Sequence, residues 1–282
     1  MNCGDCAAGA DLPPMFFRGS IRLGVLVLAF LGGLALRAQT NIASANARPG
    51  ADRDNVQVPA GTILPVRLNR GFSSKNARAG QEIIGRLMQD VPLPNAQRIP
   101  EGARLRGTVV AVSSAGKSGK GKISFRFDDI EVHRHRVPIV TDLRALASFM
   151  EVQFAQIPEA TPGFGTPYVW ATTDLIGGGV KYGVGGPVTD RGSEVVGTGT
   201  YDGVLVHVKA QSESGCRGDL DGNHDLQALW VFSAGACGVY GMSGIRIAQA
   251  GRTEPLGEIV TSAHSGDVNV RGGSGMLLRV VR

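Results

Sequence analysis

Four oxygen-bearing residues occupy alternate positions in one short segment of the chain. Asp219, Asp221, Asn223 and Asp225 surround Gly222 in the order D-L-D-G-N-H-D. Ca²⁺ takes about six to eight oxygen ligands, and alternating Asp and Asn around a glycine turn supply them from a short loop. The spacing therefore predicts a calcium site, although no Glu closes the loop as in an EF-hand. An ordinary Asp-Gly-Asn turn is the alternative.

A second set of metal-ligating residue types is Glu131, His133 and His135, which alternate along one face of a predicted strand. An H-x-H pair on a strand holds Zn²⁺ when a third ligand arrives from elsewhere in the fold. Arg134 and Arg136 lie between and beside these residues, where a hairpin tip is expected. The segment is therefore interpreted as a solvent-exposed turn rather than a zinc site.

Basic residues gather in the first half of the chain. Residues 54–144 hold 15 Lys and Arg against 8 Asp and Glu, a net charge of +7, whereas residues 145–282 hold 9 against 13, a net charge of −4. The basic residues on two predicted strands and their connection are Arg104, Arg106, Lys117, Lys120, Lys122 and Arg126. If these side chains share a face, they predict contact with an anionic partner, either an envelope protein or an anionic envelope polymer. A merely solvated basic face is the alternative. Nucleic acid is disfavoured, because aromatic residues for base stacking make up only 6% of the chain.

Catalysis has little support, because no G-x-S-x-G or H-E-x-x-H motif occurs. Asp128 and Asp129 are adjacent, so on a strand they point to opposite faces and cannot act as a carboxylate pair. We therefore predict a non-enzymatic structural or interaction component, with no cofactor unless the segment 219–225 binds calcium. The alternatives are a calcium-stabilised extracellular binding or adhesion module and a hydrolase of envelope polymers.

An uncharged, mainly apolar run covers residues 23–36 and is flanked by Arg22 and Arg37. It is shorter than the ~20 residues that a membrane-spanning helix needs. The run predicts a signal peptide over residues 1–38, with Met15 as a second candidate start, and an uncleaved anchor is the alternative. The protein is thus expected in the periplasm or on the outer surface of a bacterial cell, with no stable membrane span after cleavage. A flexible leader is expected at residues 39–55.

Two cysteines follow this segment, Cys216 and Cys237. In an oxidising compartment such a pair usually forms a disulfide, which is the prediction here. Two separate buried thiols are the alternative.

The composition favours short strands joined by tight turns. Glycine accounts for 41 of 282 residues, about twice the usual ~7%, and 14 prolines add to it. Ile123, Phe125 and Phe127 alternate with polar residues, the pattern of a half-buried strand. The predicted strands lie within residues 58–69, 82–91, 103–114, 122–132, 201–210, 226–233, 244–250, 257–263, 267–272 and 275–281. One helix is predicted between Leu143 and Phe154 from apolar residues at three- and four-residue spacing.

The fold class predicted from these segments is all-β, with at most one or two short helices. The change in charge suggests two parts: a basic, barrel- or sandwich-like β domain at residues 56–157 and an acidic, Gly-rich β domain with the disulfide at residues 166–282. A Gly- and Pro-rich linker is expected at residues 158–165.

Residues 58–112 contain three turn-and-strand motifs in a recognisable order. The motifs are Pro59-Ala60-Gly61-Thr62, then Gly80, then Ile99-Pro100-Glu101-Gly102 with Gly107. Their order resembles the C-terminal β-barrel domain of TrbI-like subunits of type IV secretion outer-membrane complexes. The resemblance covers about a fifth of the chain and implies a β-barrel and an envelope location. The whole chain is similar to bacterial secreted proteins that share this barrel-like first half.

Overall fold

The computed structural model describes residues 57–116, 119–159, 171–209 and 224–282. The described residues all belong to one compact unit, residues 50–282. The predicted signal peptide at 1–38, the leader at 39–55 and most of the linker at 158–165 lie outside the described residues. Within the described ranges, no helix has the length and apolar character required to cross a membrane.

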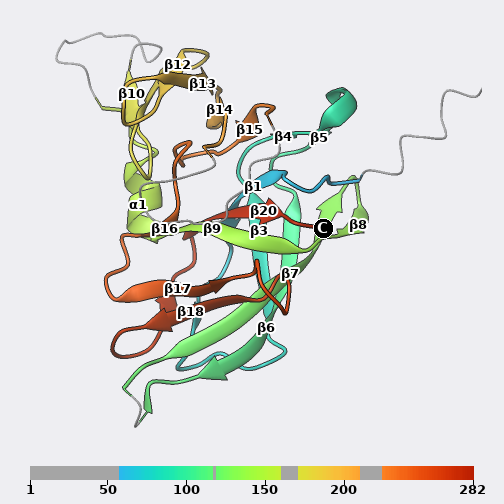
Figure 1. Cartoon of the computed structure of the whole chain (residues 1–282), viewed down its shortest axis with the longest axis vertical. Helices are drawn as coiled ribbons and strands as arrows, with labels where there is room; N and C mark the ends of the chain where they lie inside the picture. Colours follow the sequence, from blue (N-terminus) through green and yellow to red (C-terminus); the bar gives the residue numbers. More distant parts are fainter. Residues whose placement is uncertain (1–56, 117–118, 160–170, 210–223) are drawn as a thin grey trace, which may run out of the picture. The chain divides into compact units, whose positions relative to one another are not determined.

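Ten strands form the main sheet (Figure 1). Their bounds are β1 (Ile63–Leu68), β3 (Glu82–Leu87), β6 (Arg104–Ser113), β7 (Lys122–Val132), β8 (His135–Pro138), β9 (Thr141–Ala147), β16 (Gly238–Tyr240), β17 (Ile245–Ala250), β18 (Ile259–Ala263) and β20 (Gly275–Val280). The order across the sheet is β16-β9-β20-β1-β3-β6-β7-β18-β17, with β8 paired to β7. The two terminal strands of this order, β16 and β17, contact each other, so the sheet curls into a barrel-like arrangement.

A second sheet has six short strands in sequence order. They are β10 (Thr172–Asp174), β11 (Val180–Tyr182), β12 (Pro187–Thr189), β13 (Val195–Gly199), β14 (Val204–Val206) and β15 (Gln227–Ala228). Two small pairs complete the β structure, namely β2 (Phe72–Ser73) with β19 (Asn269–Val270) and β4 (Val91–Pro92) with β5 (Arg98–Ile99). The helical segments are η1 (Pro94–Ala96) and α1 (Phe149–Phe154). The all-β prediction is confirmed.

The inner face of the main sheet holds one hydrophobic cluster, to which each strand contributes alternate side chains. Leu105 and Val109 on β6 and Phe125 and Phe127 on β7 are buried in it. The rings of Phe125 and Phe127 meet edge to face, with centroids 6.2 Å apart. The alternation predicted for residues 122–132 is therefore realised, and the polar residues between these apolar ones point outward.

Strands β1, β9 and β20 are buried on both faces. Leu64, Met276 and Leu278 point into the barrel-like cluster, while Ile63 and Leu277 join a second cluster beneath the six-stranded sheet. Glutamine side chains link the two sheets. Gln89 Nε2 donates to the carbonyl of Val204 at 2.8 Å, and its Oε1 accepts from the amide of Trp230 at 2.7 Å. The second sheet is thus packed against the outside of the first.

The prediction of a helix between Leu143 and Phe154 is wrong for the first half of that segment. Residues Thr141–Ala147 form β9, and the helix begins only at Phe149, where the Ser148 hydroxyl accepts from the Glu151 amide. Every residue of β9 is buried. A strand buried on both faces lacks the polar alternation of a half-buried strand, so its apolar residues matched a helical spacing by chance.

The boundary predicted at 158–165 does not divide the main sheet. β20 lies between β1 and β9 and is hydrogen-bonded to both, and β18 pairs with β7. Strands from both predicted domains are therefore neighbours in one sheet. The change in charge along the sequence did not predict this pairing, because strands far apart in the sequence pair without regard to the charge of their surfaces.

Candidate anion-binding face

The register of β6 and β7 decides where the predicted contact residues point. Because Leu105 and Val109 face the core, Arg104 and Arg106 project from the outer face of β6. By the same alternation Arg126 projects outward from β7, where its Cα pairs with that of Thr108. The structure thus brings Arg104, Arg106 and Arg126 to one side of the sheet, here called the arginine face.

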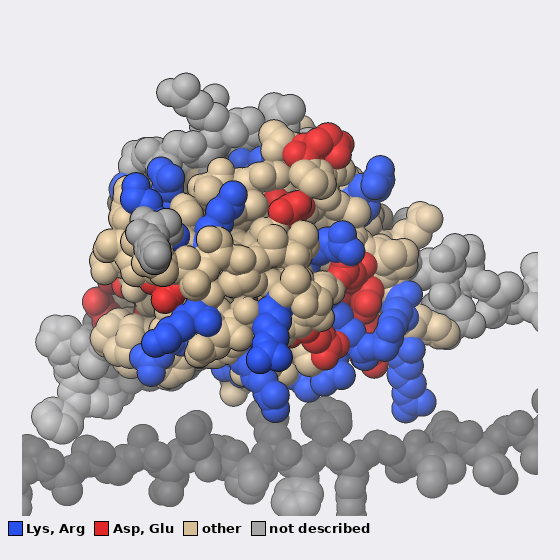
Figure 2. Space-filling model, turned by 90° about the horizontal axis from the view of Figure 1, so that it is seen from below, with Lys and Arg blue, Asp and Glu red and all other residues tan. Residues whose placement is uncertain are grey.

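Carboxylates accompany two of these three arginines. Arg106 Nη2 lies 3.5 Å from Glu131 Oε2, and Arg126 Nε donates to Asp128 Oδ1 at 2.7 Å. The other oxygen of Asp128 accepts from the Thr108 hydroxyl at 2.9 Å. The surface seen from below in Figure 2 has the same character, since Lys and Arg are spread across it and on one side lie among Asp and Glu. The arginine face is therefore a mixed surface rather than a purely basic one.

The surroundings of Arg104 differ from those of Arg106 and Arg126. The Nε of Arg104 is buried and has no hydrogen-bond partner among the described residues. The side chain lines a cleft of ≈ 530 Å³ together with Arg70, Glu82, Gln81 and Asn69. Two guanidinium groups against one carboxylate leave this cleft with an excess of positive charge.

The prediction that Asp128 and Asp129 point to opposite faces is wrong, because the strand register shifts at Asp128 and places both between the inward-facing Phe127 and Ile130. The pKa of Asp129 is shifted on this face. Burial raises its pKa above the usual 3.8; Arg106 opposes this shift, and Asp128, Glu131 and Glu82 add to it. Its Oδ1 is buried without a hydrogen-bond partner. Protonation of Asp129 therefore begins at a higher pH than for an ordinary Asp, and it increases the net positive charge of the arginine face.

Two of the three predicted lysines, Lys120 and Lys122, lie within the described residues. Lys117 lies outside the described residues. Lys122 is exposed at the far end of β7, about 13 Å along the strand from Arg126. Between them the Ser124 hydroxyl donates to Glu258. Lys120 forms an isolated parallel bridge with Gly266. Of the predicted set of six, the three arginines form the arginine face, and Lys122 lies on the same outer side of β7 as Arg126.

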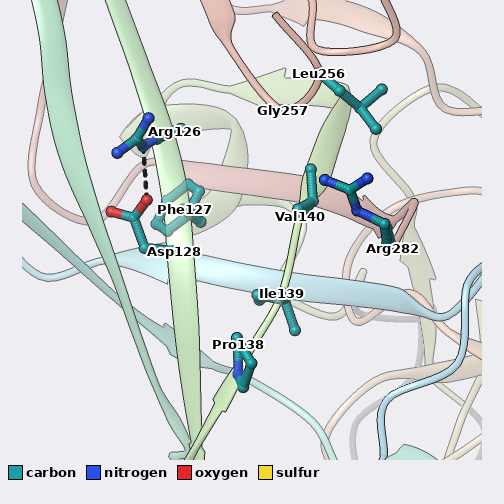
Figure 3. Close-up of a pocket in the computed structure, with 9 residues that line it drawn as sticks. All are labelled: Arg126, Phe127, Asp128, Pro138, Ile139, Val140, Leu256, Gly257 and Arg282. Carbon is teal, nitrogen blue, oxygen red and sulfur yellow. Dashed lines mark hydrogen bonds and ion pairs between the residues drawn. The ribbon is translucent and has the colours of Figure 1, made fainter.

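A second cleft opens next to Arg126, where β7 changes partner. β7 pairs with β18 as far as Phe125 and with β8 from Asp129 onward. The residues between these two pairings line a cleft of ≈ 450 Å³, here called the seam cleft (Figure 3). Its lining residues are Arg126, Phe127, Asp128, Pro138, Ile139, Val140, Leu256, Gly257 and Arg282.

The seam cleft combines an apolar floor with two cations. Phe127 and Ile139 form part of the hydrophobic core and are 2% and 4% exposed. In Figure 3, Arg126 stands on β7 on one side and Arg282 on the other, with Val140 between them. The Arg126 side chain is 57% exposed. No described Asp or Glu lies within ion-pair distance of Arg282. Nothing in the sequence linked Arg282 to Arg126, because they are brought together only by strand pairing.

The predicted calcium ligands lie mostly beyond the reach of the structure. Asp219, Asp221 and Asn223 lie outside the described residues, whereas Asp225 is exposed. Among the described residues, no group of three or more His, Cys, Asp or Glu side chains could hold a metal ion. The turn predicted near His133 is present. His133 and Arg134 have φ of 48° and 71° and form the tight connection between β7 and β8.

Cys237 is buried, 2% exposed, and forms a disulfide. Its predicted partner Cys216 lies outside the described residues. The amide of Cys237 donates to the Tyr240 hydroxyl at 2.9 Å. Nearby, the fully buried Arg144 donates to the carbonyls of Ala234 and Ala236 at 3.2 and 2.9 Å. The segment before Cys237 is thus tied to β9.

Comparison with known proteins finds no matching family model, no similar curated protein and no similar solved structure.

Proposed function

We propose that this protein is a non-enzymatic component of the bacterial envelope that binds an anionic envelope polymer through its arginine face. The observation that carries the proposal is the placement of Arg104, Arg106 and Arg126 on the outer side of two adjacent strands. Arginine remains charged at all physiological pH values, and its planar fork matches carboxylate and phosphate groups.

The mixed charge of the face favours a polymer over a single tightly held ion. Glu131 and Asp128 already form ion pairs with Arg106 and Arg126, respectively, and neutralise part of their charge. A polyanion would gain from several partly neutralised contacts and from the excess charge of the cleft beside Arg104, so binding should be salt-sensitive and moderate. The resemblance to TrbI-like barrel domains and the apolar run at residues 23–36 support an envelope location.

The binding test uses the full chain and polyphosphate as the probe. We expect the double variant Arg104→Gln/Arg106→Gln to bind polyphosphate at least about tenfold more weakly, and the slope of log K against log salt to fall by about two. The control is Arg98→Gln, which removes an arginine that is 70% exposed and lies outside the arginine face. Equal affinity of the double variant and the unaltered chain would overturn the proposal.

The location test is cell fractionation with determination of the N-terminus. We expect the protein in the envelope fraction, starting at Gln39 if the signal is cleaved after Ala38. A cytoplasmic protein that retains its N-terminal residues would contradict the envelope part of the proposal.

A further inference from the structure

We propose that the seam cleft binds a single-chain amphipathic anion, such as a free fatty acid, with its head group between Arg126 and Arg282 and its chain on the apolar floor. This site is distinct from polymer binding by the arginine face, although the two share Arg126. The proposal rests on three features of the cleft: its apolar floor, its two cations and its size.

The cleft lies where β7 changes partner, and two residues of the hydrophobic core line its floor. Between Phe125 and Asp129, β7 pairs with neither β18 nor β8, although the Ile139 amide donates to the Asp128 carbonyl at 3.1 Å. Phe127 and Ile139 lie at the bottom of the opening. Val140 and Leu256 are half-buried on its walls. An apolar chain in this position would cover mainly Val140 and Leu256, because Phe127 and Ile139 are already 2% and 4% exposed. Covering apolar surface is favourable at about 25 cal/mol per Å² buried.

The two guanidinium groups give the cleft its preference for an anion. Asp128 binds Arg126 through Nε, so the ion pair fixes the plane of this guanidinium. The two terminal nitrogens of Arg126 have no partner among the described residues and remain available to a carboxylate. Arg282 adds a second exposed guanidinium from the opposite side (Figure 3). Asp128 is the one acidic side chain among the described residues that line the cleft, so the two guanidinium groups outnumber the acidic side chains.

The size of the cleft selects a ligand with one chain. Its volume of ≈ 450 Å³ lies toward the lower end of the range of about 300–1,000 Å³ for small-molecule sites. A free fatty acid places one charge and one chain in that space, whereas a two-chain phospholipid needs a larger cavity. The ligand that fits this cleft is therefore a single-chain carboxylate.

Calorimetric titration of the full chain with decanoate, decanol and acetate, all below micelle-forming concentrations, tests the proposal. We expect decanoate to bind at least about tenfold more tightly than either decanol or acetate, because only decanoate uses both the floor and the arginines. Decanol binding as tightly as decanoate would overturn the anion part, and acetate binding as tightly as decanoate would overturn the apolar part.

Two variants separate the head-group and chain contacts. Arg282→Gln should weaken decanoate about tenfold and leave decanol unchanged. Leu256→Trp should fill the cleft and abolish decanoate binding, with Val195→Trp as the control, since Val195 is exposed on the second sheet. Decanoate binding unaffected by both Arg282→Gln and Leu256→Trp would overturn the proposal.

Polyphosphate binding distinguishes this proposal from the proposed function. Leu256→Trp should retain polyphosphate binding, whereas Arg104→Gln/Arg106→Gln should lose it and retain decanoate. Loss of both ligands in Leu256→Trp would place both at one site and overturn the assignment of a separate fatty-acid site.

Discussion

Replacement of Arg279 by Met should destabilise the protein strongly, because it breaks a buried ion pair and leaves the carboxylate in place. Asp142 on β9 is 0% exposed. Its Oδ2 accepts from Arg279 Nε at 3.1 Å and from Arg279 Nη2 at 2.5 Å, and also from Arg252 Nε at 3.2 Å. The Arg279 side chain is only 10% exposed, so water cannot fully replace it.

The expected loss in the free energy of unfolding is about 3–5 kcal/mol, the cost of leaving one partner of a buried pair behind. That loss corresponds to a fall in Tm of roughly 6–20 °C for a domain of this size. Arg252→Met should cost less, about 1–2 kcal/mol, since Arg252 makes one of the three bonds and is 19% exposed.

Urea unfolding at equilibrium measures both losses. The double variant Asp142→Leu/Arg279→Met should recover part of the loss, since it removes the buried carboxylate together with Arg279 and leaves only the partly exposed Arg252 as a charge at this position. If Arg279→Met costs less than about 1 kcal/mol, or if the double variant is as unstable as the single one, the reasoning about this buried pair is refuted. The pair matters for the seam cleft because Arg252 lies in the loop between β17 and β18, which also carries Leu256.

Three further predictions concern the arginine face and the ends of its strands. Asp129→Asn should raise stability near pH 7, because the raised folded pKa makes the native carboxylate unfavourable. The stability gained over the unaltered chain should grow as pH rises above about 4, and urea unfolding of both proteins across about pH 4–7 measures this dependence. Gly107→Ala should cost about 1–3 kcal/mol in the same assay and weaken polyphosphate binding, since a Cβ at this position would lie 2.2 Å from the Arg126 carbonyl oxygen. Asp267→Asn should reduce stability at neutral pH, because hydrogen bonds, chiefly from the Ala115 amide, lower the pKa of Asp267 and stabilise its charged form. The difference in stability between the variant and the unaltered chain should vanish in acid, as pH falls through that lowered pKa. Thermal unfolding of both proteins at neutral and at acid pH checks this prediction.

The parts of the fold that the sequence predicted are those with a strong local pattern. Strand β7 alternates Ile123, Phe125 and Phe127 with polar residues, and the structure has a strand there from Lys122 to Val132. Strand β9 was mistaken for a helix because both of its faces are buried. The strands between residues 172 and 199 have only three to five residues each, too few for a periodic pattern to emerge.

The candidate sites were also predictable only in part, because local residue spacing does not show which distant segments pair. Arg104, Arg106 and Arg126 lie on strands that are consecutive in the main sheet, so their common face followed from alternation alone. Arg282 reaches the seam cleft because β20 pairs with β9 and the following residues continue along Val140. Such a contact between distant segments leaves no trace in local residue spacing.

The position of β20 in the middle of the sheet has a consequence for how the chain acquires its structure. β1, near the start of the described residues, and β9 are both hydrogen-bonded to β20, near their end. Until residues 275–280 have been synthesised, β1 and β9 each lack a neighbour, and the two hydrophobic clusters remain open to water. Contacts so distant in sequence form slowly, because a long loop must close before any pairing energy is gained. A chain truncated before β20 should therefore be unable to fold and prone to aggregation, however complete its earlier strands are.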